Sequence, residues 1–199
     1  ATDQLTIVVD AVDATLTQAK LQALLALDGK TAVAINAGAV TSITGTGAEV
    51  TSLYEAGALG TISGLGNEAV TLSGSVSVAV ANAVAAYTTG VVTATLAETN
   101  LSDLSGLAET NNAYAVSIAD TSIDAAALNA LDAKTTGTIT LTNAATASLV
   151  GDYSAVNTAL TAFTNLQTRP VTLTGTVTAA QADTIANLTS GIVTATVAA

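Results

Sequence analysis

The chain has 199 residues, and half of them are apolar, but it contains no cysteine, histidine, methionine or tryptophan. This composition excludes a disulfide framework, a thiolate metal site and a thiol nucleophile, and it removes the commonest general base. Fifteen acidic against four basic side chains give a net charge of −11, so we expect no nucleic-acid partner, and no long apolar run predicts insertion into a membrane.

Strands and helices are predicted to alternate along the chain. Segments with apolar and polar residues in alternation predict strands, and apolar residues three and four positions apart predict helices between them. The eight predicted strands centre on Ile7, Ala34, Thr71, Ala94, Val116, Thr140, Thr172 and Ala195. Most steps between these centres are about 22 to 24 residues, a spacing typical of repeat proteins in which each coil is one strand and the helix after it. The two longer steps, from Ala34 to Thr71 and from Thr140 to Thr172, each predict an enlarged coil.

Start and stop signals agree with this spacing. Capping boxes, in which a hydroxyl and a side chain three residues later satisfy free amides, are predicted at 15–18, 46–49 and 178–181. Glycines are predicted to end helices in a left-handed conformation. They are Gly29, Gly57, Gly90, Gly137 and Gly191.

The sequence repeats itself at an offset of 101. Residues 70–76 (VTLSGSV) return as 171–177 (VTLTGTV), and residues 90–97 (GVVTATLA) return as 191–198 (GIVTATVA). We therefore expect one continuous unit over 1–199, with long repeats over about 5–97 and 114–198 joined by a coil over 98–113.

Strand–helix–strand units with right-handed crossovers predict a right-handed parallel α/β solenoid of about eight strand–helix coils. Its architecture would be similar to that of leucine-rich repeats. The chain begins in an apparent mid-strand and lacks the basic-then-apolar order of a secretory signal. We expect it to be a piece of a longer protein.

Three strings carry a resemblance to a known class of repeats. They are GLGNEAVTLSGS (64–75), NALDAKTTGTITLT (129–142) and AAQADTIANLTSGIVTATV (179–197). They resemble the tandem repeats of very large bacterial cell-surface proteins, notably giant repeat-containing proteins of cyanobacteria. The resemblance implies an exported, filament-like or cell-surface role, and it assigns no functional residues.

Threonines at alternate strand positions form the candidate binding face. Neighbouring strands lie about 4.8 Å apart, so these side chains are expected to form regular columns similar to the ice-binding face of some antifreeze solenoids. The threonines concerned are Thr71, Thr93, Thr95, Thr140, Thr142, Thr172, Thr174, Thr194 and Thr196. The alternative interpretation is that threonine, a good strand former, keeps an exposed sheet soluble.

Two aspartate pairs near strand ends offer oxygen ligands for Ca²⁺, namely Asp10 with Asp13 and Asp120 with Asp124. Their spacing lacks the density of an EF-hand, and aspartates ahead of helices commonly act as caps. No cofactor is therefore expected, with Ca²⁺ kept as the alternative.

We expect a non-catalytic structural or adhesive segment of a large extracellular or cell-surface protein, acting as a rod-like spacer or scaffold. Its expected partners are adjacent repeats of the same protein, with end-to-end association of copies as a further hypothesis. One alternative is a module that binds ice or glycan through the threonine face. Another is a hydrolase with a Ser–Lys site near Lys20, Lys30 or Lys134.

Overall fold

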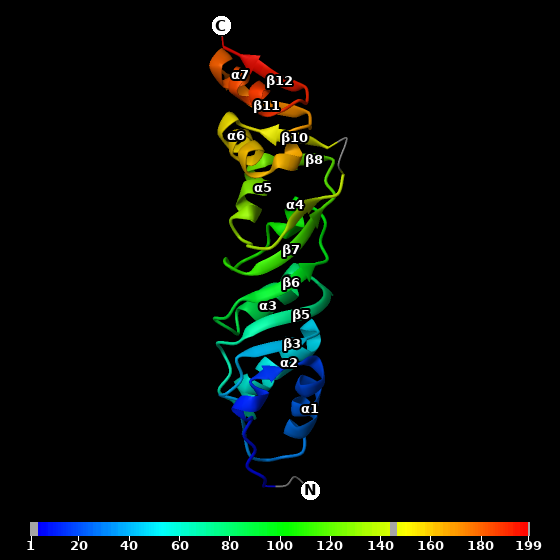
Figure 1. The fold of residues 1–199 in the computed structure, drawn as a ribbon, viewed down its shortest axis with the longest axis vertical. Helices are drawn as coiled ribbons and strands as arrows, with labels where there is room; N and C mark the ends of the chain where they lie inside the picture. The colour runs from blue at the N-terminus through cyan, green and yellow to red at the C-terminus, as the bar shows by residue number, and fades with distance from the viewer. Residues whose placement is uncertain (1–3, 144–146, 199) are drawn as a thin grey trace. The chain divides into compact units, whose positions relative to one another are not determined.

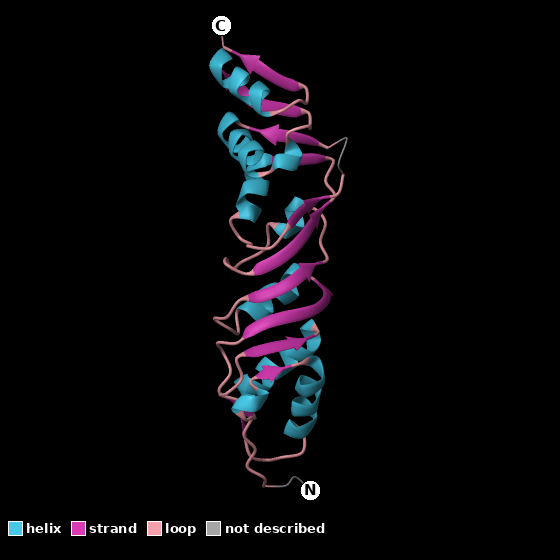
Figure 2. Cartoon of the chain, viewed as in Figure 1, coloured by secondary structure: helices cyan, strands magenta, loops and turns pink. Residues whose placement is uncertain are grey.

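The computed structural model describes residues 4–143 and 147–198, and these residues form a mixed α/β fold with parallel sheets. The chain divides into two compact units. Unit 1 comprises residues 1–97, 107–115 and 136–138, and unit 2 comprises residues 98–106, 116–135 and 139–199. In each unit, helices alternate with strands along the sequence (Figure 2).

Unit 1 contains one parallel ladder in the order β1-β3-β5-β6 and a second, two-stranded ladder, β2-β4. Residues 113–115 of β7 extend the first ladder by pairing with β6. The elements are β1 (Thr15–Leu16), α1 (Gln18–Asp28), β2 (Ile35–Asn36), β3 (Ser42–Gly45), α2 (Gly47–Leu59), β4 (Ile62–Ser63), β5 (Ala69–Val76), α3 (Val78–Ala85), β6 (Val92–Leu96) and β7 (Ala113–Ile118). The three helices and β3, β5, β6 and β7 are labelled in Figure 1. A short 3₁₀ helix spans Ala11–Asp13.

Unit 2 contains a four-stranded parallel sheet in the order β8-β10-β11-β12, and residues 116–118 of β7 pair with β9. Its elements are α4 (Leu101–Leu104), β8 (Ser122–Asp124), α5 (Ala125–Asp132), β9 (Ile139–Leu141), β10 (Ser148–Gly151), α6 (Tyr153–Ala162), β11 (Val171–Val177), α7 (Ala179–Leu188) and β12 (Val193–Val197). A 3₁₀ turn spans Thr164–Leu166.

Apolar residues on one side of the strands form the core of each unit together with the helices. In unit 1, Val92, Ala94 and Leu96 of β6 are buried while Thr93 and Thr95 between them are exposed. Alternation with period two therefore separates a core side from a solvent side, as the sequence predicts. Among the described residues, no helix has the length and apolarity that a membrane crossing requires.

Two of the three predicted capping boxes are confirmed, at Thr46 with Glu49 and at Thr178 with Gln181. The box predicted at 15–18 is wrong, because Leu16 lies in β1 opposite Ile43 and is buried there. Helix α1 begins instead after Thr17, whose hydroxyl accepts the amide of Lys20. The strand pairing of Leu16 outweighs the local cap pattern.

Some of the short strands were predicted from the sequence, and others were missed. No strand forms around Ile7, where only the bridge of Val8 to Asn36 occurs. In the part of the chain that the structure describes, the first enlarged coil contains two further strands, β3 and β4, and the second contains one, β10. Gly57 does not end a helix either, because α2 continues to Leu59 and the left-handed cap is Gly60, with φ of 78°.

A bulge bends β5 and β11 at the same place in the two long repeats. Gly74 and Gly175 have φ of 76° and 77°, and the strand register shifts around each of them. A left-handed residue inside a strand favours glycine, because a side chain there is strained. The repeated glycine thus marks a repeated bend of the backbone.

Candidate functional site

The threonine face of unit 1 consists of hydroxyl side chains in register, of which Thr71, Thr93 and Thr95 are exposed and Thr44 is half-buried. Thr71 of β5 lies opposite Thr93 of β6, and Thr44 of β3 lies opposite Thr71 on the other side. Thr95 lies opposite Ser75 because the bulge at Gly74 shifts the register. These residues form a short row across three neighbouring strands, with the buried residues of the same strands on the opposite side.

The threonines of unit 2 fall into two separate groups. Thr172 lies opposite Thr194 in the four-stranded sheet, but the register partner of Thr196 is Thr176. Thr174 precedes Gly175 in the bulge and has no register partner among the described pairs of that ladder.

Thr140 belongs to the other group, in β9, where it lies opposite Ser117. Thr142 follows this strand, and its hydroxyl donates to the carbonyl of Ile118 at 3.0 Å. The predicted threonines of unit 2 are therefore distributed over two ladders, and the bulge at Gly175 interrupts the alternation in one of them. These threonines offer a ligand side-chain hydroxyls, which can donate and accept hydrogen bonds.

The four aspartates of the calcium hypothesis are engaged in local contacts. Asp10 and Asp124 accept amides at the starts of short helices, from Val12 and Ala127 respectively. Asp120 accepts the amide of Leu101 at 2.8 Å. Asp13 pairs with Lys20, and across residues 4–143 and 147–198 no three carboxylates gather into a metal site.

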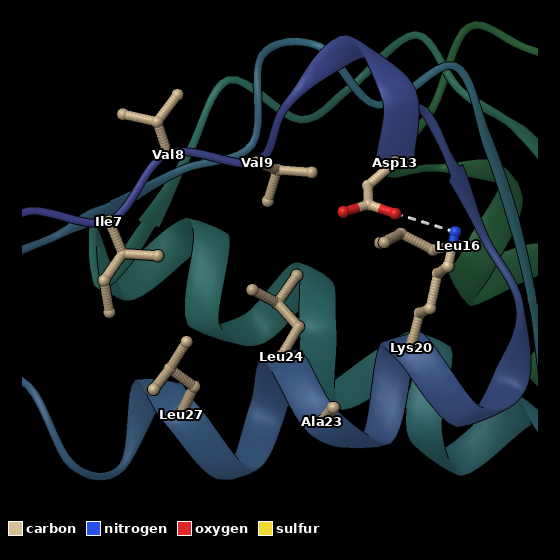
Figure 3. A pocket seen from close by; sticks show the side chains of 9 residues that line it. All are labelled: Ile7, Val8, Val9, Asp13, Leu16, Lys20, Ala23, Leu24 and Leu27. Carbon is tan, nitrogen blue, oxygen red and sulfur yellow. Dashed lines mark ion pairs between the residues drawn. The ribbon is translucent and has the colours of Figure 1, made fainter.

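A cavity of about 260 Å³ in unit 1 lies beside Lys20 (Figure 3). Its wall is mostly apolar and includes Val9 and Leu24, and the amine of Lys20 lies 2.8 Å from the carboxylate of Asp13 at one end. A Ser–Lys nucleophile requires a hydroxyl beside the amine. No serine or threonine is among the residues that line this cavity.

The structure reveals buried polar residues that the sequence analysis did not identify. Glu68 is 0% exposed, and its carboxylate accepts the Tyr54 hydroxyl and the Gly66 amide, both at 2.9 Å. Burial, followed by the negative charge of Glu68, raises the pKa of Tyr54 well above its usual range. This cluster fixes the loop that leads into β5.

Arg169 occupies the same place in unit 2, because it follows Glu68 by the repeat offset of 101. It is 2% exposed, and its guanidinium donates to the carbonyls of Asn143 at 2.6 Å and Asn165 at 3.4 Å. Burial lowers the pKa of Arg169. The alignment of the two repeats could have identified both positions, since each stands just before a strand where the flanking residues are repeated.

The same pair of threonine hydrogen bonds, here called a threonine staple, occurs at Thr88 before β6 and at Thr189 before β12. The Thr88 hydroxyl donates to the Glu68 carbonyl at 2.7 Å and accepts the Gly90 amide at 3.0 Å. The Thr189 hydroxyl donates to the Arg169 carbonyl at 3.1 Å and accepts the Gly191 amide at 3.0 Å. Each staple satisfies a carbonyl of one coil and an amide of the next, so these threonines hold successive coils together.

Comparison with known proteins finds no matching family model, no matching curated protein and no matching solved structure.

Proposed function

We propose that the chain is a non-catalytic structural repeat segment in which the two long repeats continue one right-handed parallel α/β solenoid. It would serve as a rod-like spacer or scaffold in a large exported or cell-surface protein, as the resemblance of its strings to giant bacterial surface repeats implies. Its partners would be adjacent repeats of the same protein. Acidic side chains would keep separate rods apart through charge repulsion.

The observation that carries this proposal is that equivalent residues perform equivalent structural tasks in both units. The Thr88 staple recurs at Thr189, and the glycine bulge at Gly74 recurs at Gly175. Repeat architectures gain stability by stacking such units on their neighbours. The hydroxyls of Thr88 and Thr189 and the buried charges of Glu68 and Arg169 bind backbone groups, which supports a structural role more than a chemical one.

Removing one repeat period tests the interchangeability of the two repeats. Deletion of residues 70–170 joins Ala69 to Val171 and removes 101 residues, so β11 would take the place of β5 beside β3. We expect this variant to fold and to unfold cooperatively in urea. As a control, deletion of 70–178 joins Ala69 directly to α7 and removes the strand, so it should not fold. An in-register variant as unfolded as this control would contradict the proposal.

A second candidate function is recognition of ice or glycan by the threonine face. The in-register pair of exposed threonines, Thr71 and Thr93, favours it. If this function holds, Thr93→Lys and Thr194→Lys should abolish inhibition of ice recrystallisation or binding on a glycan array. Thr184→Lys, on the exposed surface of α7, is the matched control that should leave either activity intact. Wild-type protein inactive in both assays would remove this candidate.

A further inference from the structure

Unit 2 has an open apolar groove beside its last strand. The groove has a volume of about 430 Å³ and lies between α7 and β12. Its apolar lining consists of Ala179, Ala182, Ala186, Val193, Ala195 and Val197. These side chains are all at least partly exposed, and Val197 is 47% exposed.

The equivalent surface in unit 1 lies between α3 and β6, and its residues are buried. Subtracting the repeat offset of 101 from each groove residue gives Val78, Ala81, Ala85, Val92, Ala94 and Leu96, all of which are buried. Ala81 and Val92 are 0% exposed, and Leu96 is 5% exposed. The two surfaces differ in what lies against them, since their side chains are of similar size and polarity.

Residues 107–115 of the same unit lie against that surface. Ala113, Tyr114 and Ala115 of β7 pair in parallel with Thr93, Ala94 and Thr95. Tyr114 is 0% exposed. The segment thus adds a strand to the edge of β6 and buries a large side chain beside it.

Two side-chain contacts fix this segment in place. The Asn112 Oδ1 atom accepts the amide of Val92 at 2.8 Å, and the Asn82 Oδ1 atom accepts the amide of Ala108 at 3.0 Å. In unit 2 the equivalent amide belongs to Val193, and Asp183 stands in the place of Asn82. A carboxylate oxygen accepts an amide as an asparagine oxygen does, so both contacts can form in unit 2.

We propose that the groove between α7 and β12 binds a parallel β-strand segment of the 107–115 type, with an asparagine two residues before a tyrosine. The asparagine would accept the Val193 amide, and the tyrosine would lie beside Ala195 as Tyr114 lies beside Ala94. This inference rests on the proposed repeat role and names the partner that the role requires. The bound strand would complete the edge of the sheet, which otherwise presents unpaired backbone groups.

The test is a titration of the full chain with a synthetic peptide of residues 107–115, followed by amide NMR spectra and hydrogen exchange. We expect saturable shifts at Val193, Ala195 and Val197 and slower exchange of the Val193 amide. Leu107 and Tyr114 are 1% and 0% exposed in unit 1, so a control peptide with Leu107→Ser and Tyr114→Ser should bind at least tenfold more weakly. Ala195→Glu in the chain should weaken binding of the unaltered peptide to a similar extent, while circular dichroism checks that this variant is folded.

Absence of shifts, or equal shifts with the control peptide, would overturn the inference. Shifts at β12 that depend on the concentration of the chain itself, and not on the peptide, would show that a second copy is the occupant and would also overturn it. An in-register deletion variant that folds while the full chain fails to bind the peptide would reject this inference and leave the proposed repeat role standing.

Discussion

At the scale of single residues, Glu68 and Arg169 show that the repeats conserve the burial of a position and not its charge. Both side chains are almost fully buried just before a strand, and both bind groups of the loops around them. Opposite charges at equivalent positions argue against a shared ligand and for a shared structural task. Each charge is held by a different set of neighbours, as a buried charge requires.

Tyr54→Phe should destabilise the protein by about 1–3 kcal/mol, because it removes one hydrogen-bond donor from a buried carboxylate. Chemical denaturation gives the free energy of unfolding. Tyr87→Phe is the matched control, since Tyr87 stacks on Tyr54 with ring centroids 5.2 Å apart and is 38% exposed. Equal losses in the two variants would show that the bond to Glu68 contributes nothing specific.

Burial, followed by the negative charge of Glu109, raises the pKa of Tyr114 to about 12. The usual tyrosine value is about 10, so the unfolded chain loses this proton first as the pH rises. The stabilisation by the neutral phenol is therefore complete below about pH 10 and is lost as the pH rises toward 12. Denaturation measured from pH 9 to 12 should show this loss. Tyr114→Phe should make the free energy of unfolding fall less steeply with pH in this range. An equally steep fall in the variant would contradict the raised pKa of Tyr114.

At the scale of elements, the sequence predicted well the features that depend on residues close together in the chain, such as helix caps. Thr46 and Thr178 form their capping boxes because the partner residues lie within one turn of helix. Thr15 and Leu16 were misassigned because the pairing of Leu16 with Ile43, 27 residues away, decides their conformation. Among the strands of two to four residues, β2 and β9 lie at or next to the predicted centres Ala34 and Thr140, but the others were missed because so short an alternation is a weak signal.

The prediction that Gly90 and Gly191 end helices in a left-handed conformation is wrong, because Ala86 and Thr189 are the caps there and neither glycine has a positive φ. A Cβ atom at Gly90 would overlap the carbonyl of Glu68, so this position requires glycine because two backbone segments approach closely. Gly191 meets the carbonyl of Arg169 in the same way. Close approach between coils depends on contacts distant in sequence, which a helix-end pattern does not contain.

Gly90→Ala should destabilise unit 1 by about 1–3 kcal/mol, because the added methyl group forces the coils apart. Gly29→Ala is the control, since its φ is −67° and a Cβ there lies 3.9 Å from its nearest neighbour. That change should be neutral or slightly stabilising. Thermal unfolding of both variants measures the difference, and similar melting temperatures would disprove the close-contact explanation.

At the scale of the whole molecule, the sequence correctly predicted the α/β class and the parallel pairing. The candidate site was predicted less well. Thr71 and Thr93 do lie side by side, but Thr174 lies in a bulge and Thr140 belongs to a different ladder from Thr172. Sheet membership depends on where the chain bends between strands, and alternation of residue types does not encode that bend.

Our central proposal is that the two long repeats continue one parallel α/β solenoid, and residual dipolar couplings of backbone amides test it most directly. Couplings from β5 and β6 give an alignment tensor for unit 1, and couplings from β11 and β12 give one for unit 2. A continuous stack of coils would align as one body, so the proposal predicts tensors of the same magnitude and rhombicity for the two sets of strands. Tensors of different magnitude or rhombicity would show that the two sets of strands tumble independently, and this result would contradict the proposal.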